Sequence, residues 1–220
     1  MANVDFISGI HRATARDYLG RVNEDDKAVC AEVALQWGQD YWDGDRKYGY
    51  GGFHYDGRWR SVAEEIAKHY QLADDATILD IGCGKAFLLY EFTQVLSQAN
   101  VTGLDISKYA IEHAKEEVRP ALREGNAVSL PFDDDAFDLV ISINTLHNLR
   151  NFELHQALGE IERVGQRAKY ITVESFRNEA EKVNLLYWQL TCRSFYDPAE
   201  WEWVFRRAGY AGDHSFIYFE

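Results

Sequence analysis

A short glycine-rich segment between two apolar runs constrains the fold of this 220-residue chain more than any other feature. Residues 77–86 read TILDIGCGKA, in which a strand-like run containing Asp80 leads into a glycine-x-glycine turn at Gly82 and Gly84. A helix-like run, AFLLYEFTQVL, follows directly. A strand, a glycine turn and a helix in this order are typical of the nucleotide-binding loop of a doubly wound α/β fold.

Strand-like and helix-like runs alternate along the rest of the chain. We expect strands at about 77–81, 101–105, 120–124, 138–143 and 168–174, with helices at about 85–97, 108–117 and 152–164. Further helices are expected at about 11–20, 24–37, 58–70, 178–190 and 198–208, and a last strand at 215–220. This alternation predicts an α/β, doubly wound, Rossmann-like sheet with helices on both faces. Residues 1–60 are expected to form an N-terminal helical and aromatic cap, and residues 61–220 the core.

The glycine loop favours a ligand smaller than a dinucleotide. The position of the third glycine of a dinucleotide loop, which allows close helix packing beside a pyrophosphate, is Phe87 here. Asp80 would repel phosphate but attract an ammonium group. Asp105 ends the next strand, 21 positions after Gly84, close to the spacing of an acid that binds ribose hydroxyls.

Three further segments follow in order, and together with the loop they carry a family resemblance. They are GNAVSLPF at 125–132, FDLVISINTLHNL at 137–149 and ITVES at 171–175. The chain resembles a class I S-adenosylmethionine (SAM) dependent methyltransferase of the small-acceptor, type 11 kind, over about its middle half. The resemblance implies SAM as the cofactor and an antiparallel last strand at the sheet edge.

The resemblance also implies a cofactor site. Gly82 to Gly84 would hold the methionine part, Asp105 the ribose, and Asn126 with Ala127 the adenine edge. Most relatives carry Asp at 126 and often Gly at 86, but an Asn carbonyl can still accept the adenine amino proton. Cys83 lies inside the loop and is expected to be a small packed residue. The full predicted cofactor set is Asp80, Gly82, Cys83, Gly84, Asp105, Ile106, Asn126, Ala127 and Asn144.

Two residues at the same edge of the sheet are candidate general bases, because ligands of such sheets lie beyond the carboxyl ends of the strands. His147 follows the fourth strand, and its ordinary pKa near 6.5 suits a base at neutral pH. Glu174 ends the fifth strand and competes for the role. A third alternative needs neither residue, since transfer to a nucleophilic acceptor depends chiefly on alignment and desolvation.

An aromatic segment precedes the fold. Residues 40–59 combine seven aromatic rings, five glycines and four aspartates without a clear period. They could form a loop packed by its own rings. We favour a lid at 48–58 that covers the cofactor and acceptor, with glycine hinges and with candidate contacts from Tyr48, Tyr50, Tyr55 and Arg58.

Two later arginines, Arg177 and Arg193, could bind a carboxylate or phosphate of the acceptor bidentately. They could equally form ion pairs with Glu179 or Asp197, which lie close to them in the sequence.

Composition restricts the partners. A net charge of −13 and a pI near 5.0 oppose a broad nucleic-acid surface. Three separated cysteines lack metal-ligand spacing, so no metal is expected, and they indicate reduced thiols. The chain carries neither a signal-like start nor an apolar run of about 20 residues, which predicts a cytoplasmic protein without a membrane contact.

The predicted activity is methyl transfer from SAM to oxygen or nitrogen of a small molecule. A second resemblance, to bacterial methyltransferases of surface-polysaccharide building blocks, favours a sugar or phosphorylated precursor as acceptor. The alternatives are a protein or nucleic-acid methyltransferase and a SAM-binding protein without catalysis.

Overall fold

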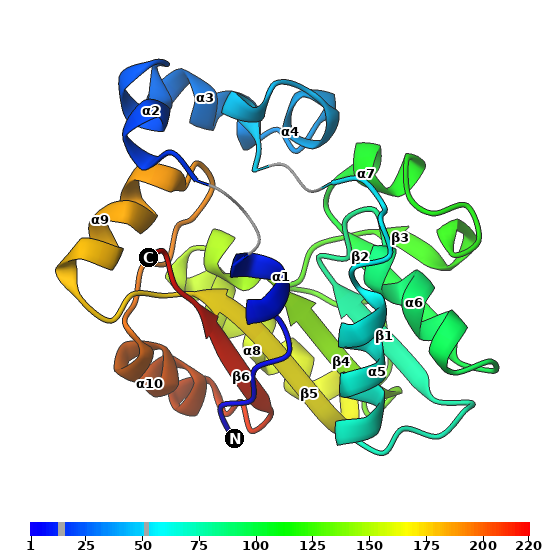
Figure 1. Cartoon of the computed structure of the whole chain (residues 1–220). Coiled ribbons are helices and arrows are strands. Elements are labelled where there is room, and N and C mark those ends of the chain that lie inside the picture. The colour runs from blue at the N-terminus through cyan, green and yellow to red at the C-terminus, as the bar shows by residue number, and fades with distance from the viewer. Residues whose placement is uncertain (13–15, 51–52) are drawn as a thin grey trace.

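A computed structural model describes residues 1–12, 16–50 and 53–220 of the chain (Figure 1). Within these ranges its centre is a six-stranded sheet in the order β3-β2-β1-β4-β5-β6, with all neighbouring strands parallel. The strands are β1 (Thr77–Ile81), β2 (Asn100–Asp105), β3 (Leu122–Glu124), β4 (Phe137–Ile143), β5 (Gly165–Glu174) and β6 (Asp213–Ile217). The predicted fold class is therefore confirmed.

Helices cover both faces of the sheet. The α-helices of the core are α5 (Arg60–His69), α6 (Phe87–Val95), α7 (Lys108–Glu112), α8 (Asn151–Val164), α9 (Glu179–Trp188) and α10 (Pro198–Ala208). Two short 3-10 helices, η2 (Arg119–Ala121) and η3 (Leu146–Asn148), lie in connections. Ile78 and Leu139 pack toward α5 and α6, whereas Leu79 and Val140 pack toward α8 and α10. Burial on both faces explains why these strands read as nearly continuous apolar runs.

The direction of the last strand differs from the prediction. We expected an antiparallel edge at 215–220, but β6 begins at Asp213 and runs parallel to β5, with Tyr170 opposite Asp213. The antiparallel expectation came from the family resemblance and was wrong: the connection from β5 through α9 and α10 brings the chain back to the end of the sheet at which β5 begins. A helical crossover of this kind returns the chain to the same end of the sheet, which gives a parallel pair.

The outer edge of β6 is partly covered by the N-terminal residues. The Val4 N–H donates to the His214 carbonyl at 2.9 Å, and the His214 N–H donates to the Ala2 carbonyl at 3.0 Å. Pairing of this kind protects an exposed sheet edge. The first residues of the chain thus contact the sheet.

The remaining N-terminal residues form short helices: α1 (Ser8–Arg12), α2 (Tyr18–Asn23), α3 (Lys27–Ala34), α4 (Gln39–Asp43) and the 3-10 helix η1 (Arg46–Tyr48). Figure 1 shows α2, α3 and α4 together beyond one end of the sheet. Cys30, Ala34, Tyr41 and Leu190 form a small apolar cluster there, and the rings of Trp37, Trp42, Tyr48, Tyr50 and Phe53 pack around it. The predicted helical and aromatic cap is present.

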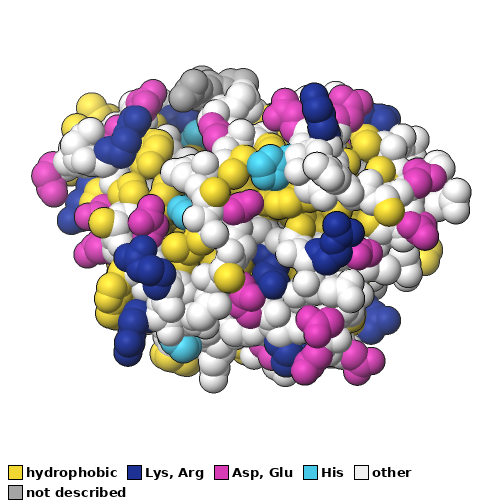
Figure 2. Space-filling model, turned by 90° about the horizontal axis from the view of Figure 1, so that it is seen from below, with side chains coloured by type: hydrophobic (Ala, Val, Ile, Leu, Met, Phe, Trp, Pro, Cys, Tyr) yellow, Lys and Arg dark blue, Asp and Glu magenta, His cyan; other side chains and the backbone are white. Residues whose placement is uncertain are grey.

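The surface at the other end of the molecule is mixed in charge. Figure 2 shows acidic and basic side chains interspersed with apolar ones on the face at the bottom of Figure 1. None of the helices in the described ranges has the length and apolar character needed to span a lipid bilayer.

Candidate active site

The loop between β1 and α6 requires its two glycines. Gly82 and Gly84 have φ values of +77° and +52°, in the left-handed region that favours glycine. A Cβ atom at Gly82 would lie 2.1 Å from the Thr145 hydroxyl oxygen. The Gly82 N–H donates to the Leu104 carbonyl at 2.7 Å, which ties the loop to β2. The loop therefore brings the ends of β1, β2 and β4 together.

Asp105 shapes this loop as well as ending β2. Its Oδ2 accepts a hydrogen bond from the Gly84 N–H and its Oδ1 accepts one from the Ser107 N–H, both at 2.7 Å. Each oxygen retains acceptor capacity. Burial raises the pKa of Asp105, while the bonds from Ser107 and Gly84 oppose that effect.

Asp80 lies deeper, at 4% exposure, and within the described residues its Oδ1 has no hydrogen-bond partner. Burial, followed by the nearby charge of Asp105, raises the pKa of Asp80 to about 8. A buried carboxyl oxygen without a donor is a costly arrangement, and a ligand ammonium would relieve it. The site therefore has the chemistry expected for the amino group of a bound amino acid.

The other predicted cofactor residues surround the loop in different environments. Cys83 is buried and its thiol contacts the Gly84 carbonyl at 3.8 Å; burial raises its pKa, as expected for an inert packed thiol. Ile106 is 55% exposed beside Asp105. Ala127 is buried and Asn126 is exposed, with its Oδ1 accepting the Val128 N–H at 3.1 Å. Asn144 is exposed and has a φ of +55°.

Helix α4 docks on the glycine loop, a contact that the sequence did not reveal. A Cβ at Gly84 would lie 2.7 Å from the ring of Trp42, and the Trp42 indole N–H donates to the Ser107 hydroxyl at 2.9 Å. Lys85 Nζ pairs with Asp43 Oδ1 at 2.5 Å. Two features of the sequence could have indicated this contact. They are the position of Lys85 directly after the loop and the two aromatic rings between acidic residues in DYWD.

The predicted lid, residues 48–58, contacts two other parts of the core. The Tyr50 hydroxyl donates to Gln189 Oε1 at 2.6 Å and accepts the N–H groups of Leu190 and Thr191. The Tyr55 hydroxyl donates to Glu91 on α6 at 2.7 Å.

The remaining lid residues make local contacts or are not described. Arg58 forms an ion pair with Asp56, and Tyr48 lies under the Lys47 ammonium group. Gly51 and Gly52, the expected hinges, lie outside the described residues. Closure of this segment stays a prediction.

His147 and Glu174 lie together at the ends of β4 and β5. His147 Nε2 is 3.4 Å from Glu174 Oε2, and the Glu174 backbone N–H donates to His147 Nδ1, also at 3.4 Å. The first of these is a close polar contact without hydrogen-bond geometry, since Glu174 Oε2 has no hydrogen-bond partner among the described residues. Accepting at Nδ1 places the hydrogen of the neutral ring on Nε2, facing the carboxyl group.

Burial shifts both groups of this pair. It lowers the pKa of His147 to about 3 and raises the pKa of Glu174 to about 8. The charge of Arg16 and a hydrogen bond from Gln189 oppose the shift of Glu174 in part. At neutral pH the imidazole is therefore uncharged, while the carboxyl group titrates near the working range.

The two later arginines differ in their contacts. Arg177 pairs with Glu181 and Glu220, at 2.5 Å in each case. The side chain of Arg193 is exposed, and its backbone N–H donates to the His147 carbonyl at 2.8 Å. Arg177 is thus engaged in ion pairs, whereas Arg193 fixes the backbone of His147.

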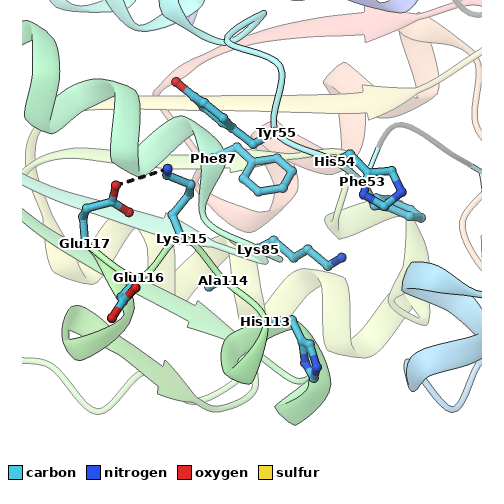
Figure 3. Close-up of a pocket in the computed structure, with 10 residues that line it drawn as sticks. All are labelled: Phe53, His54, Tyr55, Lys85, Phe87, His113, Ala114, Lys115, Glu116 and Glu117. Carbon is cyan, nitrogen blue, oxygen red and sulfur yellow. Dashed lines mark ion pairs between the residues drawn. The ribbon is translucent and has the colours of Figure 1, made fainter.

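A cavity of about 540 Å³ lies on the outer side of the loop (Figure 3). Its walls come from the last part of the cap, from the loop and α6, and from the segment after α7: Phe53, His54, Tyr55, Lys85, Phe87, His113, Ala114, Lys115, Glu116 and Glu117. Lys115 points toward Glu117, 3.2 Å away, and its ammonium lies 4.5 Å from the centre of the Tyr55 ring. These contacts engage Lys115 within the protein.

The profile of the family described as "Methyltransferase domain" matches residues 72–209, more than half of the chain and the whole glycine-loop region. The chain belongs to the class I SAM-dependent methyltransferases. SAM is the cofactor of this family, and the free oxygen of Asp80 and the position of Asp105 fit its amino acid and ribose parts.

Curated relatives of this methyltransferase domain act on different acceptors. It is 32% identical over 107 residues to the phthiotriol/phenolphthiotriol dimycocerosates methyltransferase of Mycobacterium tuberculosis, covering 47% of this chain and 39% of that protein. It is 32% identical over 114 residues to the demethylmenaquinone methyltransferase of Listeria monocytogenes, covering 49% of this chain and 46% of that protein. The chain spans less than half the length of these relatives.

Solved structures share the fold. The YcgJ protein of Bacillus subtilis matches with a TM-score of 0.55 and 21% identity, over 66% of each chain. A geranyl diphosphate methyltransferase in complex with SAM matches with a TM-score of 0.56 and 15% identity, over 68% of this chain and 64% of that one.

Proposed function

We propose that this chain transfers the methyl group of SAM to oxygen or nitrogen of a small-molecule acceptor. The observation that carries the proposal is the buried Glu174 carboxyl group beside His147, at the same edge of the sheet as the glycine loop. A titratable group near neutrality at this edge is what proton removal from an acceptor requires.

In this proposal the glycine-loop region holds the cofactor. Asp80 binds the ammonium group, Asp105 the ribose hydroxyls, and Asn126 with Ala127 the adenine edge. Ile106 is exposed next to Asp105 and offers an apolar surface for the adenine ring. Bound SAM would supply a methyl group attached to a sulfonium sulfur. The nucleophile of the acceptor reacts with the methyl carbon when it is aligned on the side opposite the sulfur.

We assign the base to Glu174 and an orienting role to His147. A carboxyl group with a pKa near 8 is ionised often enough at neutral pH to accept the proton of an acceptor hydroxyl or ammonium. His147, with its pKa near 3, is a weak base, and its Nδ1 already accepts the Glu174 N–H while its Nε2 carries the ring hydrogen. The imidazole instead packs beside the carboxyl group, 3.4 Å from its Oε2, and restricts the directions in which it can turn.

The acceptor proposed is a small molecule, and among small molecules a sugar or phosphorylated precursor of a surface polysaccharide. The curated relatives, which act on small molecules, support the first part. The net charge of −13 and the mixed surface of Figure 2 favour such an acceptor over nucleic acid. A cytoplasmic location belongs to the same proposal and is supported by the three free cysteines.

The test is formation of S-adenosylhomocysteine from SAM with a panel of sugar, phosphorylated and lipid-like acceptors. Calorimetric titration with S-adenosylhomocysteine separates cofactor binding from turnover. Binding with acceptor-dependent turnover supports the proposal. Binding without turnover on any member of the panel would favour a SAM-binding protein that does not catalyse transfer, and turnover on a protein or nucleic acid alone would replace the acceptor class.

A further inference from the structure

Three arginines converge on one tryptophan between the cap and α9. The guanidinium carbons of Arg16, Arg21 and Arg46 lie 5.7, 4.6 and 5.5 Å from the ring centre of Trp188. Trp188 ends α9 and is buried, and the Tyr50 ring is 6.4 Å from it. The three arginines are not part of one sequence motif, so the cluster could not be predicted from the sequence.

The cluster concentrates positive charge in an acidic protein. Arg21 uses its side-chain donors on neutral groups: the carbonyls of Trp188 at 2.7 Å, Arg46 at 3.1 Å and Gly49 at 3.0 Å. Burial lowers the pKa of Arg16 and of Arg21; Tyr18 and Glu174 oppose this shift for Arg16, Tyr50 opposes it for Arg21, and the charge of Arg46 adds to it for both. Like charges held this close favour a nearby anion.

The cluster lies beside the proposed acceptor site. Arg16 is close enough to Glu174 to act on its charge. The Arg21 guanidinium is 5.4 Å from the centre of the Tyr50 ring, whose hydroxyl donates to Gln189, the residue that also bonds Glu174. Arg46 is exposed, so the cluster runs from Glu174 toward solvent.

We propose that Arg16, Arg21 and Arg46 form a subsite that binds a phosphate group of the acceptor. This inference rests on the proposed function for its place in catalysis, because the phosphate would hold the acceptor with its nucleophilic atom toward Glu174. Three guanidinium groups favour a phosphate, which carries up to two negative charges and several acceptor oxygens, over a carboxylate. Contact with the Trp188 ring helps to hold the three guanidinium groups in place.

The test is calorimetric titration of the full chain with inorganic phosphate, and separately with acetate, at constant ionic strength. We expect one phosphate per chain and clearly weaker acetate binding. Arg46→Gln should weaken phosphate binding about tenfold, the loss expected for one charged hydrogen-bond donor. Arg206→Gln is the matched control, because Arg206 is an exposed arginine paired with Glu202 on α10.

Arg21→Gln should weaken phosphate binding at least as much. Because Arg21 also donates hydrogen bonds to three backbone carbonyls, the thermal unfolding of this variant is measured as well. Equal phosphate affinity in wild type and Arg46→Gln, equal binding of acetate and phosphate, or no phosphate binding would each overturn the subsite. The titration needs neither SAM nor acceptor. Failure of the subsite is therefore distinguishable from failure of methyl transfer, which S-adenosylhomocysteine binding and formation report.

Discussion

At the scale of single residues, Asp80 is the clearest link between burial and cofactor binding. Its carboxyl group is neutral at pH 7 without a ligand, because its pKa is near 8, and an ammonium group would favour the ionised form. Binding should therefore release a proton below about pH 8. We expect affinity for S-adenosylhomocysteine to rise between about pH 6 and 8, and the pH dependence to flatten in Asp80→Asn together with a weaker affinity.

Calorimetry in buffers of different ionisation enthalpy measures this proton release. The stability of the ligand-free protein gives an independent check, because it should fall with rising pH over the range in which affinity rises. Because the folded pKa lies above the unfolded one, the folded state holds more protons between about pH 4 and 8, so this group lowers stability as the pH rises. Asp80→Asn should remove that slope. Glu112→Gln, an exposed acid on α7, is the control, and an unchanged pH profile in Asp80→Asn would reject the ammonium assignment.

A second residue-scale prediction separates Glu174 from His147. Glu174→Gln should lower the transfer rate about 10²- to 10⁴-fold, while His147→Ala should lower it much less and shift the pH profile of the base. The wild-type rate should rise through about pH 8, as Glu174 loses its proton. Single-turnover rates measure both effects at saturating SAM.

Glu181→Gln is a matched control, since Glu181 is also a buried glutamate but pairs with Arg177. A large loss in His147→Ala with an active Glu174→Gln would give the role of base to His147. Two active variants would leave alignment as the mechanism.

At the scale of elements, the contact between α4 and the glycine loop holds this part of the cap in position on the core. Hydrogen bonds from Lys85 and Tyr109 keep the pKa of Asp43 below its ordinary value even though burial would raise it. Asp43→Asn would leave Lys85, which is only 7% exposed, without its ion pair. We expect faster amide exchange in residues 39–43 in this variant, measured by hydrogen exchange.

Asp45→Asn is a nearby comparison, because Asp45 accepts a local bond from the Lys47 N–H in η1. Equal exchange in the two variants would mean that the ion pair does not hold α4. The same measurement with S-adenosylhomocysteine compares residues 39–43 with residues 48–58, the predicted lid.

Features that depend on residues close together in the sequence could be predicted, whereas features that depend on residues far apart in the sequence could not. The glycine loop and Asp105 could be predicted because loop, helix start and acid depend on residues close in sequence. The direction of β6 could not, because it depends on where α10 returns the chain. Aromatic composition singled out residues 40–59, for which a self-packed loop and a lid stayed open, but it could not show that Trp42 lies against Gly84.

At the scale of the whole molecule, the N-terminal residues cover an edge of the sheet and also lie beyond one end of its strands. Residues 2–4 pair with β6, and the chain then forms the helices that lie beyond the strand ends. The division of the chain after residue 60 stays a prediction. The cap contacts the core at its beginning, through α4 and at the Tyr55–Glu91 hydrogen bond.

The ring of Trp42 resting on Gly84 has a kinetic consequence. If the cofactor reaches the loop only when this ring lifts, the observed association rate should level off at the opening rate instead of rising in proportion to ligand concentration. Stopped-flow mixing with S-adenosylhomocysteine measures this dependence, and Trp42→Ala should restore proportionality. A linear dependence in the wild type would mean that the ring does not gate entry. If the rate does level off, the same opening also sets the time that a cofactor spends on the protein, so that one indole group controls both its binding and its release.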